Sequence, residues 1–226
     1  MPRAVCLLSG GLDSCVAAAV ARSHGFDLFA LSIDYGQRHA RELVAARAVA
    51  GALKAREHKV VRVDLAALGG SALTGANVPV PQDRREAEMA AGIPATYVPA
   101  RNTVFLSIAL GWAEVLDADA IYFGANAVDY SGYPDCRPEY VAAFQRLGAL
   151  ATKRGVEGRP IKIEAPLLTK TKADIVRLGA ELKAPLERTW SCYLGGVQQC
   201  GRCDSCRLRR KGFAEAGVDD PVPYEA

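Results

Sequence analysis

The chain has 226 residues, of which 50% are hydrophobic and 23% are charged, and its formal net charge is +3. This length supports one complete core that buries about 70% of the unfolded surface, and it excludes a second large domain. The charge is too small to indicate a direct nucleic-acid partner, and no stretch approaches the ~20 apolar residues of a membrane-spanning helix. Because no secretion signal is visible either, we expect a cytoplasmic protein without a membrane partner.

Short apolar runs alternate along the chain with longer stretches of helical periodicity, a pattern typical of a parallel sheet with helices on both faces. The predicted strands are residues 4–8, 28–33, 58–63, 120–123 and 161–164. The predicted helices are residues 14–23, 40–53, 103–115, 139–152 and 171–178. We therefore expect an α/β fold with a twisted, Rossmann-like parallel sheet. Ligands of such sheets bind at the carboxyl ends of the strands, where residues 9–14, 34–37 and 124–126 should converge.

Residues 9–14, with the sequence SGGLDS, join the first predicted strand to the first predicted helix. The two glycines let the backbone approach a ligand closely, the serines add hydroxyl donors, and the following helix N-terminus favours phosphate. Asp13 fits among phosphate donors if it holds a Mg2+ that bridges phosphate oxygens. The segment predicts a site for a nucleotide pyrophosphate, with a glycine-rich turn as the alternative interpretation.

The loop lacks the Gly-Lys-Ser/Thr ending of kinase-like phosphate loops and the third glycine of the dinucleotide fingerprint. It resembles the SGGxDS loop of the N-type ATP pyrophosphatases, a superfamily that adenylates a substrate oxygen and releases pyrophosphate. The resemblance implies that the chain uses ATP with Mg2+, and it leaves the substrate open. The ATP-binding residues that we expect are Leu8, Ser9, Gly10, Gly11, Leu12, Asp13, Ser14, Cys15, Asp34 and Tyr35.

Residues 69–96 interrupt the alternation with several glycines, prolines and small polar residues and with a charged patch at 83–88. A loop of this length without regular structure is uncommon in a compact domain unless it has a function. We predict a mobile lid over the site, and the alternative is an irregular insertion.

Residues 129–140, with the sequence DYSGYPDCRPEY, form a turn-rich segment after the fourth predicted strand. Tyr130 or Tyr133 could stack on a ring, Asp135 could accept hydrogen bonds from an amino group, and Arg137 could hold a carboxylate. The segment therefore predicts a pocket for a planar polar heterocycle. The alternative is a turn followed by a helix that an aspartate caps.

Cys192, Cys200, Cys203 and Cys206 follow the spacing C-x7-C-x2-C-x2-C. Four thiolates are the ligand set of a structural Zn2+ ion. Zinc is favoured over a disulfide because the expected compartment is reducing, and over an iron–sulfur cluster because nothing indicates redox chemistry. We predict one Zn2+ per chain, which holds residues 189–226 together beside an ATP-binding domain of residues 1–188 and takes no part in the chemistry.

Three further segments complete a resemblance to the 7-cyano-7-deazaguanine synthases of queuosine biosynthesis. They are DYGQRH at residues 34–39, YVPARN at 97–102 and SGYPDCR at 131–137. Together with the phosphate loop and the terminal cysteines, they extend the resemblance over nearly the whole chain. One departure is Ala100, where many members of the family have glycine, and we expect little consequence from it.

The resemblance implies a ligase that forms C–N bonds, using ATP and free ammonia to convert 7-carboxy-7-deazaguanine into its nitrile through adenylated acid and amide intermediates. It also implies a homodimer. The catalytic residues that we expect are Asp13, Arg101 and Lys172, the last preferred over Lys170. The substrate-binding residues that we expect are Arg101, Asn102, Tyr130, Tyr133, Asp135 and Arg137.

Two other functions stay open at this point. A tRNA thiolation enzyme of the same superfamily would need reactive cysteines near the ATP site, for which only Cys6, Cys15 and Cys136 are available. A zinc-ribbon adaptor for nucleic acid would use the basic residues 207–211 but would leave the phosphate loop unexplained. A solvated helix face is the simpler interpretation of this basic segment, including Arg209.

Overall fold

The computed structural model describes residues 1–75, 77–89, 92–127 and 133–225. Its parallel sheet has five strands in the order β3-β2-β1-β4-β5. The strands are β1 (Arg3–Leu7), β2 (Asp27–Asp34), β3 (Glu57–Arg62), β4 (Ala120–Tyr122) and β5 (Lys162–Glu164). All five predicted strands are confirmed, and no end shifts by more than one residue.

The five predicted helices are also confirmed, and the described residues contain three further helices. The helices are α1 (Leu12–Ser23), α2 (Arg41–Ala52), α3 (Glu86–Met89), α4 (Arg101–Val115), α5 (Pro138–Ala151), α6 (Lys153–Val156), α7 (Lys172–Glu181) and α8 (Asp204–Ala216). Short 3-10 turns lie at Ala66–Leu68, Pro134–Cys136 and Leu186–Arg188. Within the described ranges, no helix is both long and apolar enough to span a bilayer.

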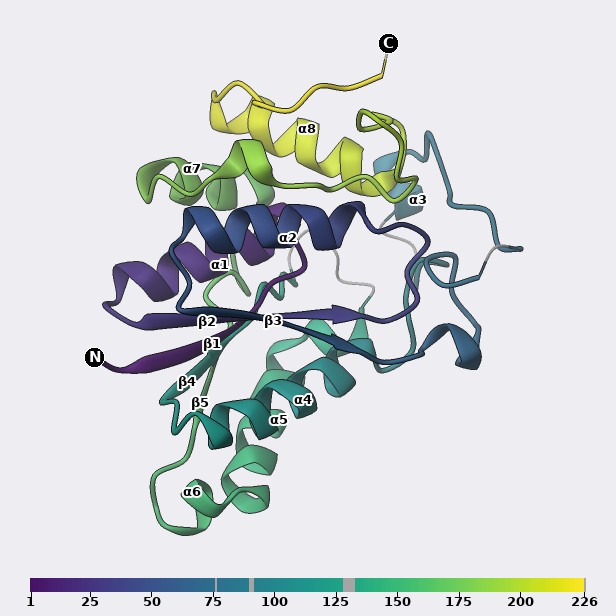
Figure 1. Ribbon diagram of the computed structural model, residues 1–226. Coiled ribbons are helices and arrows are strands. Elements are labelled where there is room, and N and C mark those ends of the chain that lie inside the picture. Colours follow the sequence, from purple (N-terminus) through teal and green to yellow (C-terminus); the bar gives the residue numbers. More distant parts are fainter. Residues whose placement is uncertain (76, 90–91, 128–132, 226) are drawn as a thin grey trace.

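The helices cover both faces of the sheet. Figure 1 shows α1, α2, α7 and α8 on one side and α4, α5 and α6 on the other. The strand β1 serves both layers, because successive side chains of a strand point to opposite faces. Cys6 packs with α1 in one core cluster, whereas Val5 packs with α4 in the other. Burial on both faces explains why β1 reads as a continuous apolar run.

The strand order places β1 and β4 side by side at the centre of the sheet. The chain leaves β1 toward α1 on one face and leaves β4 toward α5 on the other face (Figure 1). A crevice opens at the carboxyl end of a sheet where connections diverge in this way. The fold therefore positions the loop after β1 and the loop after β4 on either side of one site.

The C-terminal segment packs into the main body of the protein. Phe213 of α8 lies in the same core cluster as residues of α1 and α7. Arg209 is only 1% exposed, with Nε 2.9 Å from Oδ2 of Asp220 and Nη1 2.6 Å from the hydroxyl of Thr189. The interpretation of Arg209 as a solvated charge is therefore wrong. Its partner Asp220 follows the end of α8, where a helical pattern gives no indication of a contact.

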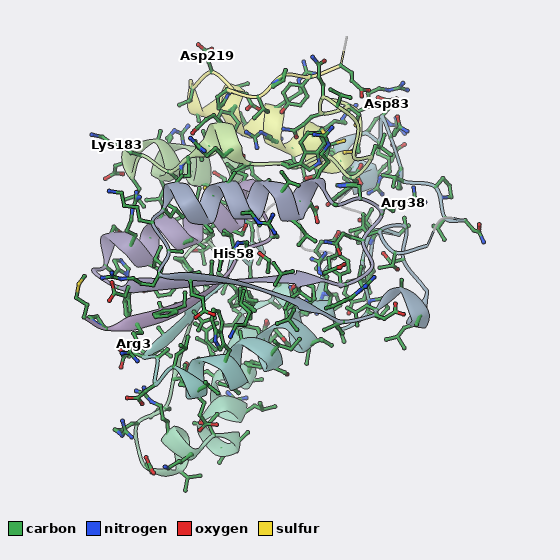
Figure 2. The ribbon with its side chains drawn as sticks, in the orientation of Figure 1. Arg3, Arg38, His58, Asp83, Lys183 and Asp219 are labelled. Atoms are coloured by element: carbon green, nitrogen blue, oxygen red, sulfur yellow. The ribbon has the colours of Figure 1, made fainter. Side chains whose placement is uncertain are left out.

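The long segment of residues 69–96 contacts the C-terminal segment. Asp83 pairs with Arg202, and its backbone N–H donates to the Arg202 carbonyl at 2.9 Å. Arg84 pairs with the buried Asp204, and Arg38 donates hydrogen bonds of 2.8 and 2.7 Å to the carbonyls of residues 75 and 78. Figure 2 labels Arg38 and Asp83 on this side of the molecule. Closure of the segment as a lid stays a prediction.

Candidate active site

One pocket, with a cavity volume of about 260 Å³, lies at the carboxyl ends of the central strands. The expected convergence is confirmed, because the phosphate loop, Tyr35, Gln37 and residues 124–126 all line it. Among the residues expected to bind ATP or substrate, the lining includes Leu8, Ser9, Gly11, Leu12, Asp13, Ser14, Tyr35, Arg101, Asn102, Tyr133 and Lys172. It does not include Gly10, Cys15, Asp34, Asp135 or Arg137. Tyr130 lies outside the described residues.

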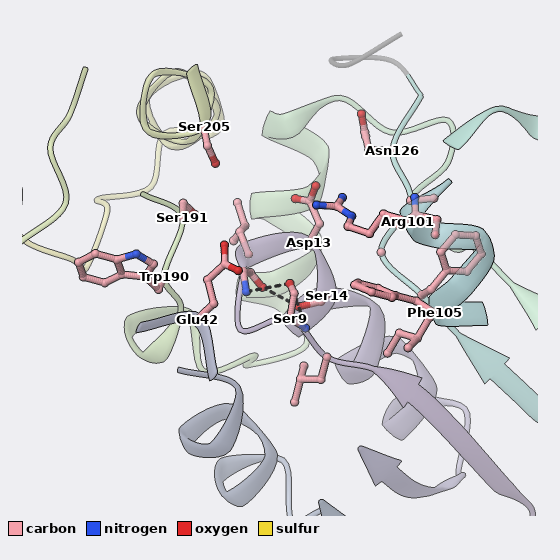
Figure 3. A pocket seen from close by; sticks show the side chains of 18 of the residues that line it. Ser9, Asp13, Ser14, Glu42, Arg101, Phe105, Asn126, Trp190, Ser191 and Ser205 are labelled. Atoms are coloured by element: carbon pink, nitrogen blue, oxygen red, sulfur yellow. Dashed lines mark hydrogen bonds between the residues drawn. The ribbon is translucent and has the colours of Figure 1, made fainter. Parts of the chain in front are cut away.

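The phosphate loop is held in shape by its own serines (Figure 3). The hydroxyls of Ser9 and Ser14 lie 3.0 Å apart, and the Ser14 hydroxyl donates to the carbonyl of Gly11 at 3.0 Å. Gly11 is the N-cap of α1, and no side chain of the described residues caps this helix. The residues of its first turn line the pocket, and a helix N-terminus without a side-chain cap is an arrangement that binds phosphate.

Gly10 serves the packing of the loop as well as its backbone conformation. Its φ is +87°, and a Cβ at this position would lie 2.2 Å from the carbonyl oxygen of Glu42 and 2.7 Å from the backbone nitrogen of Ala46. The carbonyl of Gly10 also accepts the N–H of Trp190 at 2.8 Å. Glycine is required here because α2 and the C-terminal segment both contact the loop at this point.

Lys172 and Asp13 form an ion pair at the rim of the phosphate loop. The ammonium of Lys172 lies 2.9 and 2.8 Å from the two carboxylate oxygens of Asp13. Thr171 and Asp174 cap α7 reciprocally, which sets Lys172 at the first helical position. Gly212 of α8 leaves room for the Lys172 side chain, since a Cβ there would lie 2.4 Å from its Cγ. Lys170 is absent from the described pocket lining, so Lys172 is the better candidate for a phosphate contact.

Arg101 projects from the first turn of α4 against two aromatic rings. Its guanidinium carbon lies 5.8 Å from the ring centre of Tyr35 and 5.9 Å from that of Phe105. The preceding residue, Ala100, has a φ of 53°, a left-handed conformation that glycine adopts more easily. Alanine in this conformation adds some backbone strain beside Arg101, and the expectation that it has little consequence stays a prediction.

Asn102 and Asp135 bind each other. The carboxylate of Asp135 accepts the backbone N–H of Asn102 at 2.9 Å, and the Asn102 amide donates to the Asp135 carbonyl at 3.1 Å. Asp135 is 6% exposed and Arg137 is exposed at the N-cap of α5. These contacts join α4 to the turn at Pro134–Cys136, and Tyr133 beside it donates or accepts a 2.9 Å hydrogen bond with the hydroxyl of Thr96.

The C-terminal segment supplies a wall of the pocket that the sequence did not reveal. Trp190, Ser191, Tyr193 and Ser205 line the cavity together with residues of the phosphate loop. Figure 3 shows Trp190, Ser191 and Ser205 on the side of the pocket that faces away from Arg101. No local motif marks these residues, because their position depends on the path of the chain through the cysteine cluster.

The four terminal cysteines meet as predicted. Their sulfur atoms lie within 4.8 Å of one another and are buried, so the cluster could hold a metal such as zinc. The sulfurs of Cys200 and Cys206 lie 3.9 Å apart, close to the roughly 3.8 Å that Zn–S bonds of ~2.3 Å impose on a tetrahedron. Backbone N–H groups approach the sulfurs of Cys192 and Cys200 at 3.3–3.4 Å and suit thiolates.

The other thiols are not activated. Cys6 and Cys15 are buried, with Cys15 in the core rather than in the pocket, and burial raises the pKa of each to about 12. Cys136 lines the pocket, but burial raises its pKa to about 11. All three are neutral at physiological pH and so lack the thiolate that a sulfur-transfer nucleophile needs.

Glu42 is a pocket residue that the sequence did not indicate as functional. It lies in the first turn of α2, and its side chain lines the cavity beside the phosphate loop. A glutamate near a helix N-terminus is common on protein surfaces, so its residue type and position carry no signal. Burial raises the pKa of Glu42 to about 7, and the nearby Arg101 opposes this shift.

Comparison with known proteins agrees with this site. The family model described as queuosine biosynthesis protein QueC matches residues 3–217. A 7-cyano-7-deazaguanine synthase from Saccharophagus degradans is 60% identical over 224 residues, covering 98% of this chain and 97% of that protein. The synthase from Anaeromyxobacter dehalogenans is 61% identical over 224 residues, covering 98% and 95%. The chain belongs to the QueC family of queuosine biosynthesis proteins.

Proposed function

We propose that this chain is a 7-cyano-7-deazaguanine synthase, a ligase that uses ATP to convert 7-carboxy-7-deazaguanine and ammonia into the nitrile. The identity of about 60% to curated synthases over nearly their full length is the observation that carries this proposal. The pocket supports it, because an uncapped helix N-terminus suited to phosphate lies beside a wall with one arginine and several aromatic rings.

A carboxylate is a poor electrophile, so its oxygen is first adenylated and pyrophosphate leaves. Ammonia then displaces AMP to form the amide, and a second activation of the amide oxygen lets the nitrile form. The task of the protein is to align the reactants and to neutralise negative charge on the leaving groups. Arg101 is the cation that we assign to the substrate carboxylate, with Tyr35 and Phe105 as apolar support for the heterocycle.

The phosphate end of the site has its own division of roles. The first-turn N–H groups of α1 and the ammonium of Lys172 are assigned to the phosphates of ATP. Asp13 is the residue that would hold the Mg2+ that accompanies ATP, where it neutralises phosphate charge. The ammonium of Lys172 lies 2.8 Å from the carboxylate of Asp13, so the two groups are adjacent at this end of the site.

The cysteine cluster is assigned to one structural Zn2+ ion. Four thiolates leave no open coordination position, so these residues hold the C-terminal wall in place and contact no substrate. A cytoplasmic location is expected because thiolates stay reduced there. The homodimer stays a prediction that sedimentation analysis of the zinc-loaded protein tests.

The test is to incubate the zinc-loaded protein with 7-carboxy-7-deazaguanine, ammonium and Mg-ATP and to identify base and nucleotide products by mass spectrometry. Nitrile and AMP are expected. The variant Arg101→Ala should lower turnover by at least about tenfold, because it removes a charge-assisted contact to the carboxylate, and should melt near the wild-type temperature. Arg56→Ala is the matched control, since Arg56 is 62% exposed and pairs with Asp27 at the start of β2. If the wild type binds ATP and makes no new base, the substrate assignment fails.

A further inference from the structure

The carboxylate of Glu42 faces the reaction site from the wall opposite Arg101. In Figure 3, the two side chains enter the pocket from opposite sides of Ser9 and Ser14. The position of Glu42 is fixed, because the backbone of its helix turn contacts Gly10 so closely that no Cβ fits between them. A group that crosses the pocket from Arg101 toward α2 therefore meets this carboxylate.

Glu42 differs from Asp13, the other carboxylate that lines the pocket. Asp13 has a cation within 2.8 Å, the ammonium of Lys172. Within the described part of the chain, the carboxylate of Glu42 has neither a hydrogen-bond donor nor an ion-pair partner within contact distance. A half-buried carboxylate beside a phosphate site repels the nucleotide unless a cation joins it. When Glu42 is ionised, a small cation that enters the pocket would therefore neutralise it at this place.

This inference rests on the proposed function, a reaction that takes its nitrogen from ammonia. Ammonia is present almost entirely as ammonium at neutral pH, and ammonium has no lone pair with which to attack. We propose that Glu42 binds ammonium in the pocket and accepts the proton whose removal makes the nitrogen nucleophilic. Its place opposite Arg101 brings the nitrogen toward the carboxyl carbon that Arg101 orients.

The transfer of the nitrogen to the acyl carbon involves two proton transfers. Glu42 takes one of the four ammonium protons, and the freed electron pair forms the bond from nitrogen to the acyl carbon. The carbon–oxygen bond to AMP breaks, and its electron pair leaves with AMP. The phosphate of AMP takes a second nitrogen proton, which leaves the neutral amide, and Glu42 returns its proton to solvent.

The local electrostatics suit a proton acceptor. Burial raises the pKa of Glu42 to about 7, while the charge of Arg101 lowers it. Proton transfer is most efficient when the pKa of the acceptor lies near the working pH. A carboxylate that is disfavoured by burial and yet kept facing a pocket indicates a functional role rather than a stabilising one.

The experiment separates the two halves of the reaction. Only the conversion of acid to amide consumes ammonium, whereas the conversion of amide to nitrile needs ATP alone. Glu42→Gln should slow amide formation by about a hundredfold, the usual contribution of a positioned base. Its conversion of added 7-amido-7-deazaguanine to nitrile should stay within about threefold of wild type. Hydroxylamine, which is largely neutral near pH 7, should restore acyl transfer in the variant.

Glu57→Gln is the matched control, because Glu57 lies on the edge strand β3 with 46% of its side chain exposed. It should behave as wild type in both halves. The proposal is overturned if Glu42→Gln slows both half-reactions equally, or if hydroxylamine does not restore its acyl transfer. Either result assigns Glu42 to ATP or Mg2+ binding. A wild-type enzyme that makes no amide from the acid refutes the proposed function instead, so the two failures are distinguishable.

Discussion

The phosphate loop and the C-terminal wall line the same pocket but are built in different ways. The loop is closed by hydrogen bonds among Ser9, Gly11 and Ser14, which lie within five positions of one another. The wall depends on the cysteine cluster and on partners far away in the sequence, such as Arg84, which pairs with Asp204 across 120 positions. A locally closed loop keeps its shape when distant parts loosen, whereas a wall assembled from distant parts does not.

Removal of the metal should show the largest difference between the C-terminal wall and the phosphate loop. A structural four-cysteine zinc site provides roughly 10–16 kcal/mol of binding free energy, so chelation or Cys203→Ser should release the C-terminal wall and abolish ATP binding. The chain has two tryptophans, Trp190 in the wall and Trp112 in α4. Chelation should change the fluorescence of Trp190 in a Trp112→Phe variant. Trp112 fluorescence in the Trp190→Phe variant should stay unchanged, because the sheet stays folded. If chelation changes the fluorescence of both tryptophans in parallel, the wall and the sheet do not loosen independently.

Gly10→Ala tests the point where loop, α2 and wall meet. The added Cβ would lie 2.2 Å from the Glu42 carbonyl, so we expect a loss of about 3 kcal/mol or more in unfolding free energy and weaker ATP binding. Gly25→Ala is the control, because Gly25 has a similar φ of +82° and nothing within 4 Å of its Cβ position. Urea denaturation gives the unfolding free energy of each variant, and the difference between their losses is the cost of the steric clash at Gly10. Equal losses would mean that backbone strain alone explains the glycine.

The pH dependence of stability tests the titration of Glu42, which lies between the phosphate loop and the C-terminal wall. Its pKa rises from 4.5 to about 7 on folding, so folding favours the protonated form, and stability falls as pH rises through this window. Glu42→Gln should therefore be more stable than wild type at pH 8, by on the order of 1–3 kcal/mol, with the difference gone at pH 4. Thermal melts across this range measure it. A constant difference at all pH values would show that Glu42 does not titrate in this way.

Ala100→Gly probes the opposite wall and has the smallest expected effect. The left-handed conformation of alanine costs about 1–2 kcal/mol, and glycine loses about 0.5–1 kcal/mol more chain entropy on folding. The variant should therefore gain up to about 1 kcal/mol, with turnover near wild type. Denaturant titration checks the gain. A destabilised variant would indicate that the methyl group of Ala100 makes contacts that outweigh the strain.

Sequence patterns predicted the sheet well because both periodicity and local turns are short-range properties. The five strands, their parallel arrangement and the position of the phosphate loop at the end of β1 follow from apolar runs and from one glycine-rich turn. The cysteine spacing likewise predicted a cluster that the structure confirms. The helical character of residues 207–211 was expected, but the burial of Arg209 was missed, because its partner Asp220 lies beyond the end of α8.

Short motifs were enough to indicate a loop suited to phosphate, a four-cysteine cluster and the family of the chain. Which side chains share the pocket could be seen only in the tertiary structure. Lys172 reaches Asp13 across 159 positions, and Glu42 reaches the same cavity because Gly10 admits α2 against the loop. Contacts of this kind depend on how elements pack, and the packing of distant elements leaves no periodic trace in the local sequence.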